Sequence, residues 1–181
     1  AAKAYMARDG LFDDVDAAIS WHPSTFNAVQ HGHSLANSRI DFTFHGKAAH
    51  AAAAPQLGRS ALDACELMNV GVNYLREHMP DSARVHYAYL DAGGVAPNVV
   101  QAKATVRQLV RAADLDTLRD LVLRVRSIGD GAAMMTGTTL ETKVYSGVSN
   151  LVGNRPLEET MQREFEKLGP VPFEADDASL A

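Results

Sequence analysis

Between residues 34 and 146 the apolar side chains change their period several times, and each change marks a new structural element. Ile40, Phe42 and Phe44 alternate with polar residues, which is the period of a strand with one buried face. Further along, apolar residues recur every three or four positions, which places them on one side of an amphipathic helix. The pattern predicts strand 40–45, helix 59–79, strand 85–89, strand 100–107, helix 115–128 and strand 138–145.

This β-α-β-β-α-β order predicts an α+β domain over residues 34–146. Four strands in that order close well as an antiparallel sheet, with the two helices on one face. The flanking segments, 1–33 and 147–181, are each too short to form a core of their own. We therefore expect an inserted domain between two pieces of another one.

Two elements are expected in the flanking segments. Val15–Trp21 is a short apolar run that predicts a buried strand and ends next to His22. A helix is expected from Leu157 to Gly169, because a proline stands at its start and a glycine at its end. Neither end of the sequence has a helix cap or a terminating element, which predicts a piece of a longer protein.

Charge and composition exclude several classes of partner. The formal net charge of −5 favours neither nucleic acid nor an anionic membrane surface. Cys65 is the only cysteine, so the chain forms no internal disulfide, and its place in a helical stripe predicts burial. The sequence has neither the run of about 18 apolar residues that spans a membrane nor the layout of a secretory signal. We expect a cytoplasmic protein.

His50 lies in the stretch GKAAHAAAAPQLGRSALDA, between a predicted strand and a predicted helix. Small residues allow a backbone to approach a ligand or another chain closely, and Gly46 and the alanines provide that freedom. A neutral imidazole on such a turn can donate a hydrogen bond to a developing oxyanion. It can equally cap the following helix, and the local pattern leaves both interpretations open.

Three other residues are candidates for binding. Asn98 follows two glycines and a proline in a turn, and Arg111 follows the third strand, where a rigid strand end favours a bidentate grip on a carboxylate. Because His50, Asn98 and Arg111 all lie near the ends of strands or turns, they are candidates to converge on one ligand. His22 follows a predicted strand, where either a metal ligand or a hydrogen-bonded structural histidine is found.

His31 and His33 have the spacing of a two-histidine chelate, but no carboxylate or cysteine stands nearby in the sequence. We interpret both as solvated loop histidines.

Four segments, VDAAISWHP, GKAAHAAAAPQLGRSALDA, GGVAPNVVQAKA and LVRA, resemble the M20 family of metallopeptidases and amidohydrolases, in its aminoacylase-type branch. The resemblance extends over nearly the whole chain. It implies a catalytic domain that depends on zinc or manganese, and an inserted lid domain of β-α-β-β-α-β form. It also implies hydrolysis of the amide bond of an N-acyl amino acid such as aminobenzoyl-glutamate, a homodimer formed through the lid, and a possible second subunit.

The resemblance also implies roles for single residues. His22 matches a metal-ligand position, and His50 matches the lid histidine that reaches into the active site of the partner subunit. Asn98 and Arg111 match lid positions that hold the carboxylate and carbonyl end of the substrate.

Other parts of the family pattern are absent from the sequence. The first histidine-aspartate pair, the bridging carboxylate, the glutamate pair and the final metal histidine do not occur. We therefore expect these 181 residues alone to bind no catalytic metal tightly and to hydrolyse nothing. The alternative is an α+β binding or dimerisation module without catalysis, since this arrangement of elements serves many small domains.

Overall fold

The computed structural model describes residues 2–24, 26–31 and 34–172. These residues form two compact units. The sheet unit comprises residues 34–150, and the second unit comprises the described residues before 34 and after 150. No helix in the described part of the chain has the length and apolar character needed to cross a membrane.

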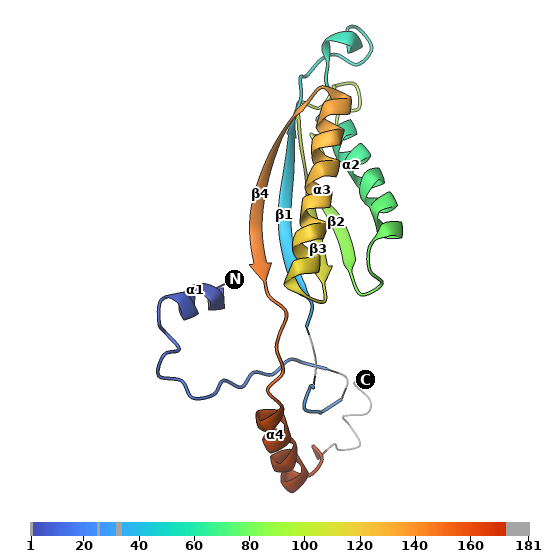
Figure 1. The fold of residues 1–181 in the computed structure, drawn as a ribbon. Coiled ribbons are helices and arrows are strands. Elements are labelled where there is room, and N and C mark those ends of the chain that lie inside the picture. Colours follow the sequence, from blue (N-terminus) through green and yellow to red (C-terminus); the bar gives the residue numbers. More distant parts are fainter. Residues whose placement is uncertain (1, 25, 32–33, 173–181) are drawn as a thin grey trace. The chain divides into compact units, whose positions relative to one another are not determined.

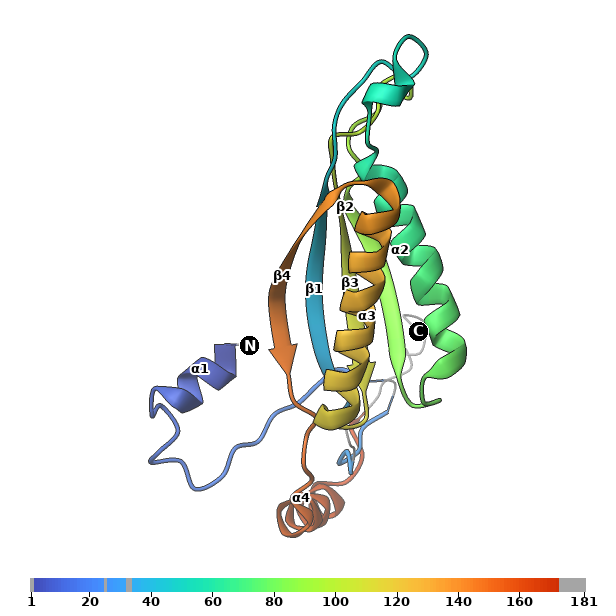
Figure 2. The same cartoon turned by 45° about the horizontal axis from the view of Figure 1, so that its top comes forward.

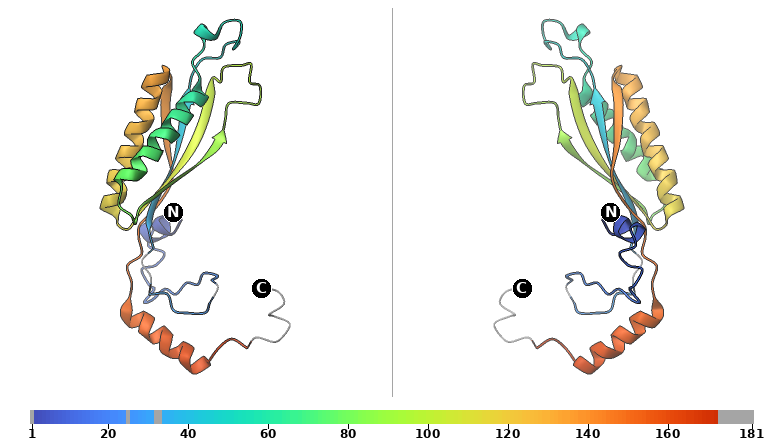
Figure 3. Two further views of the ribbon diagram at one scale, coloured as in Figure 1. Left: turned by 90° about the vertical axis from the view of Figure 1, so that its right-hand side faces the viewer. Right: turned by 90° about the vertical axis from the view of Figure 1, so that its left-hand side faces the viewer.

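The sheet unit contains one four-stranded sheet in the order β2-β3-β1-β4, and all three strand pairs are antiparallel. Helices α2 and α3 lie on one of its faces (Figure 1; Figure 3). The α+β prediction of a four-stranded antiparallel sheet with two helices on one face is confirmed. The elements are β1 Ala36–His45, α2 Ala61–Leu75, β2 Arg84–Asp91, β3 Lys103–Ala112, α3 Leu115–Thr136 and β4 Thr139–Val148.

The core lies between the two helices and the sheet. Ile40, Phe42 and Phe44 of β1 are fully buried, as their alternation predicts. The stripes of α2 and α3 contribute residues such as Met68 and Leu121 to the same cluster. Each large apolar side chain buried there stabilises the fold by about 1.5–3 kcal/mol.

Side chains define the starts of both helices. Ser60 caps α2 by accepting a hydrogen bond from the backbone N–H of Asp63, and Asp114 caps α3 through the N–H of Thr117. Helix α3 ends at Gly137, whose φ of 65° is the left-handed conformation that glycine adopts without strain. The sequence prediction of Asp114 as the cap of α3 is confirmed.

Two predicted strands differ from the observed ones. Strand β3 begins at Lys103 rather than Val100, because residues just before it pair with a loop instead of a neighbouring strand. The prediction of a buried strand over Val15–Trp21 is wrong: this segment has no strand conformation, and Ile19 and Trp21 are 65% and 84% exposed. A strand is stable only beside another strand, and the observed sheet does not include this segment.

The second unit contains two helices, α1 Ala2–Arg8 and α4 Arg155–Leu168. The side chain of Asn154 caps α4 by accepting from the N–H of Leu157, and Pro156 stands in its first turn. The predicted helix in this region is confirmed. Neither helix buries a residue.

Candidate functional site

Two loops lie together at one end of the sheet (Figure 2). The histidine loop, 46–60, follows β1, and the asparagine loop, 92–102, precedes β3. The N–H of Ala51 donates to the carbonyl of Asn98 over 3.0 Å, and the N–H of Val100 donates to the carbonyl of Ala49 over 3.0 Å. His50 thereby pairs with Val99 as an isolated bridge, which places the segments around His50 and Asn98 side by side.

Close backbone contact within the histidine loop explains its glycine. Lys47 and Arg59 exchange two backbone hydrogen bonds of 2.8 and 2.9 Å, which closes the base of the loop. A Cβ atom on Gly46 would lie 2.0 Å from the carbonyl oxygen of Arg59, so only glycine fits at this position.

The ring of His50 is held in a defined state by its own turn. Its Nδ1 accepts hydrogen bonds from the backbone N–H groups of Ala52 and Ala53, with distances of 3.2 and 3.1 Å. Because Nδ1 is an acceptor, the proton of the neutral ring is on Nε2. The residue is exposed, so Nε2–H is available as a donor to a group outside the loop.

The alternative interpretation of His50, as a cap of the following helix, is wrong. Ser60 caps α2, and the short 3₁₀ helix Pro55–Leu57 has no side-chain cap. The imidazole instead closes the turn in which it lies.

Arg111 lies at the other end of the sheet from His50 and Asn98. It is the ninth residue of β3, where it faces Asn37 of β1 and Arg84 of β2. At about 3.3 Å per residue, the strand places Arg111 about 26 Å from its first residue, Lys103. One copy of the chain therefore does not bring the three residues to one ligand, contrary to the expectation of convergence.

His22 lies in an exposed segment of the second unit without regular structure. Its Nδ1 donates to the carbonyl oxygen of Pro23 over 3.0 Å, so the proton of the neutral ring is on Nδ1. Nε2 is then the nitrogen with a free lone pair for a metal.

Residues 35–130 match the family model of the M20 peptidase dimerisation domain. The chain belongs to this family. It is 44% identical over 179 residues to one of the subunits of p-aminobenzoyl-glutamate hydrolase from Escherichia coli (strain K12), a match that covers 99% of the chain and 37% of the relative. It is 31% identical to the Xaa-Arg dipeptidase of Mus musculus, a match that covers 98% of the chain and 41% of the relative.

A solved structure shows the same fold. The aminobenzoyl-glutamate utilization protein from Klebsiella pneumoniae matches with a TM-score of 0.59 and 22% identity, over 72% of the chain and 33% of that protein. The chain of this M20 dimerisation domain thus spans about two fifths of the length of the curated relatives it matches.

The residues that the structure describes do not form a metal site. No three side chains of histidine, cysteine, aspartate or glutamate lie together among them in an arrangement that fits a metal ion. Cys65, on α2, is buried as predicted. Burial raises the pKa of its thiol to about 12, so it is neither a metal ligand nor a nucleophile at neutral pH.

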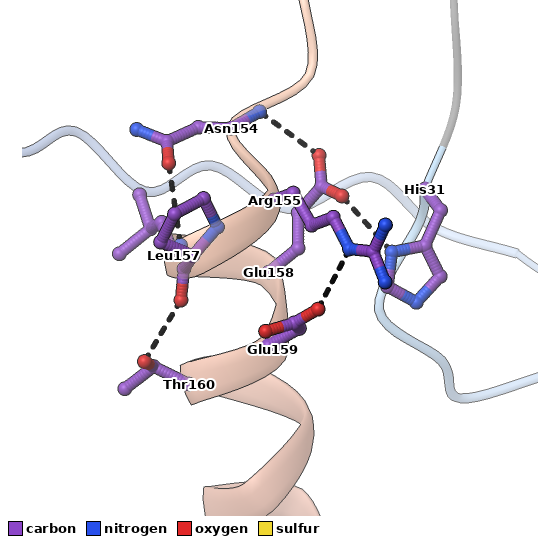
Figure 4. A network of polar contacts seen from close by, with 8 residues as sticks. His31, Asn154, Arg155, Leu157, Glu158, Glu159 and Thr160 are labelled. Atoms are coloured by element: carbon purple, nitrogen blue, oxygen red, sulfur yellow. Dashed lines mark hydrogen bonds and ion pairs between the residues drawn. The ribbon is translucent and has the colours of Figure 1, made fainter.

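His31 has a partner that the sequence does not reveal. Its Nδ1 lies 2.9 Å from a carboxylate oxygen of Glu158, at the start of α4 (Figure 4). The other oxygen of Glu158 accepts from the backbone N–H of Asn154. His31 therefore joins two distant segments of the second unit, while His33 lies outside the described residues.

A polar cluster on the open face of the sheet also escaped the sequence analysis. Arg107 of β3 donates to both carboxylate oxygens of Asp41 on β1, over 2.6 and 2.8 Å, and lies 4.2 Å from the centre of the Tyr145 ring. The hydrogen bond to Asp41 raises the pKa of Arg107. Alternation alone places these residues on the outer face, but only the strand register identifies them as neighbours.

Proposed function

We propose that the chain is the lid part of a longer amidohydrolase that cleaves the amide bond of an N-acyl amino acid. Its membership in the M20 dimerisation family and the names of its hydrolase and dipeptidase relatives support this. The E. coli relative suggests aminobenzoyl-glutamate as the substrate to test. Because that relative is named as one of several subunits, a second kind of subunit is also proposed.

His50 is the proposed catalytic residue of the lid. The observation that carries the proposal is the pair of backbone N–H groups on Nδ1, which leaves Nε2–H as the donor. A donor held in place before the reaction stabilises the negative charge that develops on the carbonyl oxygen of the amide. Small residues on both sides of His50 allow the loop to enter a narrow cleft.

The complete site is proposed to use two copies of the chain. Arg111 is exposed and suited to a bidentate grip on the substrate carboxylate, but it lies at the far end of the sheet from His50 and Asn98. In a twofold dimer, the loops of one copy can approach the Arg111 end of the other copy. One active site then takes His50 and Asn98 from one chain and Arg111 from its partner.

A divalent metal, manganese or zinc, is proposed for the longer protein on the basis of the family. In this chain only His22 is a proposed ligand, and the other ligands would have to come from residues outside it.

The dimer surface is proposed to be α2 together with the edge strand β2. Leu67, Val70 and Tyr74 form an exposed apolar stripe on α2, and they are 38%, 48% and 66% exposed. Tyr87 and Tyr89 of β2 are each 40% exposed on the side of the sheet that carries the helices. Apolar surface beside an unpaired strand edge suits pairing with a second copy.

The test is hydrolysis of aminobenzoyl-glutamate by the full-length protein, measured as release of aminobenzoate. We expect His50→Ala to lower kcat by about 100- to 1,000-fold, as for the loss of one oxyanion donor. His45→Ala is the matched control, because His45 is an exposed histidine of β1 whose ring contacts only Glu141. Equal activity of the His50→Ala variant and the wild type would refute the catalytic role and favour a dimerisation module.

A further inference from the structure

The open face of the sheet carries three arginines in two adjacent cross-strand rows. In the first row, Arg84 of β2 faces Arg111 of β3, which also faces Asn37 of β1. In the next row, Leu109 lies between His86 and Arg39. We name Arg39, Arg84 and Arg111 the basic corner.

Positive charge in the basic corner is not neutralised by the neighbouring strands. Like charges directly opposite each other on a sheet destabilise it, and the two rows of the described strands contain no carboxylate. In the row beyond them, Asp41 is bound by Arg107 through both oxygens. The sequence thus keeps unfavourable contacts between cations at one corner of a chain whose net charge is −5.

The carboxylates of the adjoining turns do not neutralise the corner either. Asp114, which follows β3, uses its two oxygens for the N–H and hydroxyl of Thr117. Asp81, in the turn before β2, contacts Arg84 through its backbone carbonyl and makes no ion pair among the described residues. Within the described part of the chain, the guanidinium groups of Arg39 and Arg111 have no hydrogen-bond or ion-pair partner.

Arg84 is held at this corner by the backbone. Its Nη1 donates to the carbonyl of Ala83 over 2.6 Å and to the carbonyl of Asp81. These contacts involve one terminal nitrogen, so the other N–H groups of the guanidinium remain for an anion. The group is therefore positioned without being neutralised.

We propose that Arg84 is a specificity-determining residue that binds the side-chain carboxylate of an acidic amino acid, while the neighbouring Arg111 binds its α-carboxylate. The inference rests on the proposed function, in which Arg111 holds the substrate carboxylate. Residues directly opposite on a sheet have Cβ atoms about 5 Å apart, which suits the two carboxylates of a single glutamate or aspartate. A neutral amino acid in this position leaves one arginine without a partner, so the site selects for a dicarboxylate.

The test compares aminobenzoyl-glutamate with aminobenzoyl-glutamine, which has the same shape but no side-chain charge, as substrates of the full-length protein. We expect the wild type to prefer glutamate and Arg84→Gln to lower kcat/KM for glutamate by about 10- to 100-fold, chiefly through KM. Activity on the glutamine substrate stays within about twofold. Arg119→Gln, at an exposed arginine of α3 that pairs with Asp116, is the matched control.

A second measurement separates failure of the inference from failure of the proposed function. Binding of glutarate and of its monoamide to the full-length protein is measured by calorimetry, with a thermal melt of each variant as a check on folding. Tighter binding of glutarate, lost in Arg84→Gln, supports the inference even if neither amide is hydrolysed. Equal binding of both compounds by the wild type, or an unchanged preference in Arg84→Gln, overturns the inference while hydrolysis still supports the function.

Discussion

At His50, two backbone amides perform the task that a carboxylate or carbonyl often performs for a catalytic histidine. The N–H groups of Ala52 and Ala53 fix the ring orientation and place the proton on Nε2. Side chains larger than alanine are not needed for these contacts, since only the backbone takes part. The run of alanines around His50 is thus compatible with both a defined ring and a narrow loop.

Reactivity of Cys65 provides a prediction for a single residue. Burial raises the pKa of this thiol to about 12, so the thiolate that reacts with labelling reagents is scarce at pH 8. We expect a thiol-specific reagent to label the folded chain at pH 8 at least about 100-fold more slowly than the chain in denaturant. Because Cys65 is the only cysteine, the signal reports on it alone. Rapid labelling without denaturant would contradict its placement in the core.

Two paired loops, rather than a helix or a strand, position the candidate site. The histidine loop is closed at its base by Lys47 and Arg59, and it is fixed to the asparagine loop through Ala49, Ala51 and Val100. Backbone hydrogen bonds make all of these contacts. The loops are therefore rigid where they meet, although their residues are largely exposed.

Substitution of Gly46 tests this closure. Gly46→Ala places a Cβ atom 2.0 Å from the carbonyl oxygen of Arg59, so the base of the loop must open. We expect a lower melting temperature and a fall in kcat of the full-length protein of at least about tenfold. Gly131→Ala is the control, since a Cβ on this glycine of α3 meets no atom within 4 Å. In a helix that change stabilises by about 0.5–1 kcal/mol, and a similar gain for Gly46→Ala would refute the account.

The sequence predicts elements well where a periodic core face exists, and poorly where contacts depend on distant backbone. The alternation of Ile40, Phe42 and Phe44 specifies a buried face, and the structure shows it. The apolar run at Val15–Trp21 carries the same signal, but apolar character does not specify a neighbouring strand, and the segment is exposed. The separation of Arg111 from His50 follows from strand direction, which local spacing does not reveal.

For the whole molecule, the proposed dimer surface can be tested by charge. We expect Val70→Glu or Tyr74→Glu on α2 to raise the dissociation constant of the dimer at least about tenfold, because each buries a charge against a second copy. Leu123→Glu, at a 64% exposed leucine of α3, is the control and leaves the dimer intact. Analytical ultracentrifugation measures all three. A wild type that is monomeric at high concentration, or a dimer broken only by Leu123→Glu, would exclude this surface.

A complementation experiment tests the shared active site most directly. Full-length chains carrying His50→Ala and chains carrying Arg111→Ala are each expected to be nearly inactive alone. If one site combines His50 of one chain with Arg111 of the other, each mixed dimer regains one intact site, and random mixing restores about a quarter of the wild-type rate of aminobenzoyl-glutamate hydrolysis. If both residues serve the same site from one chain, the mixture remains as inactive as its parents, which would contradict the account.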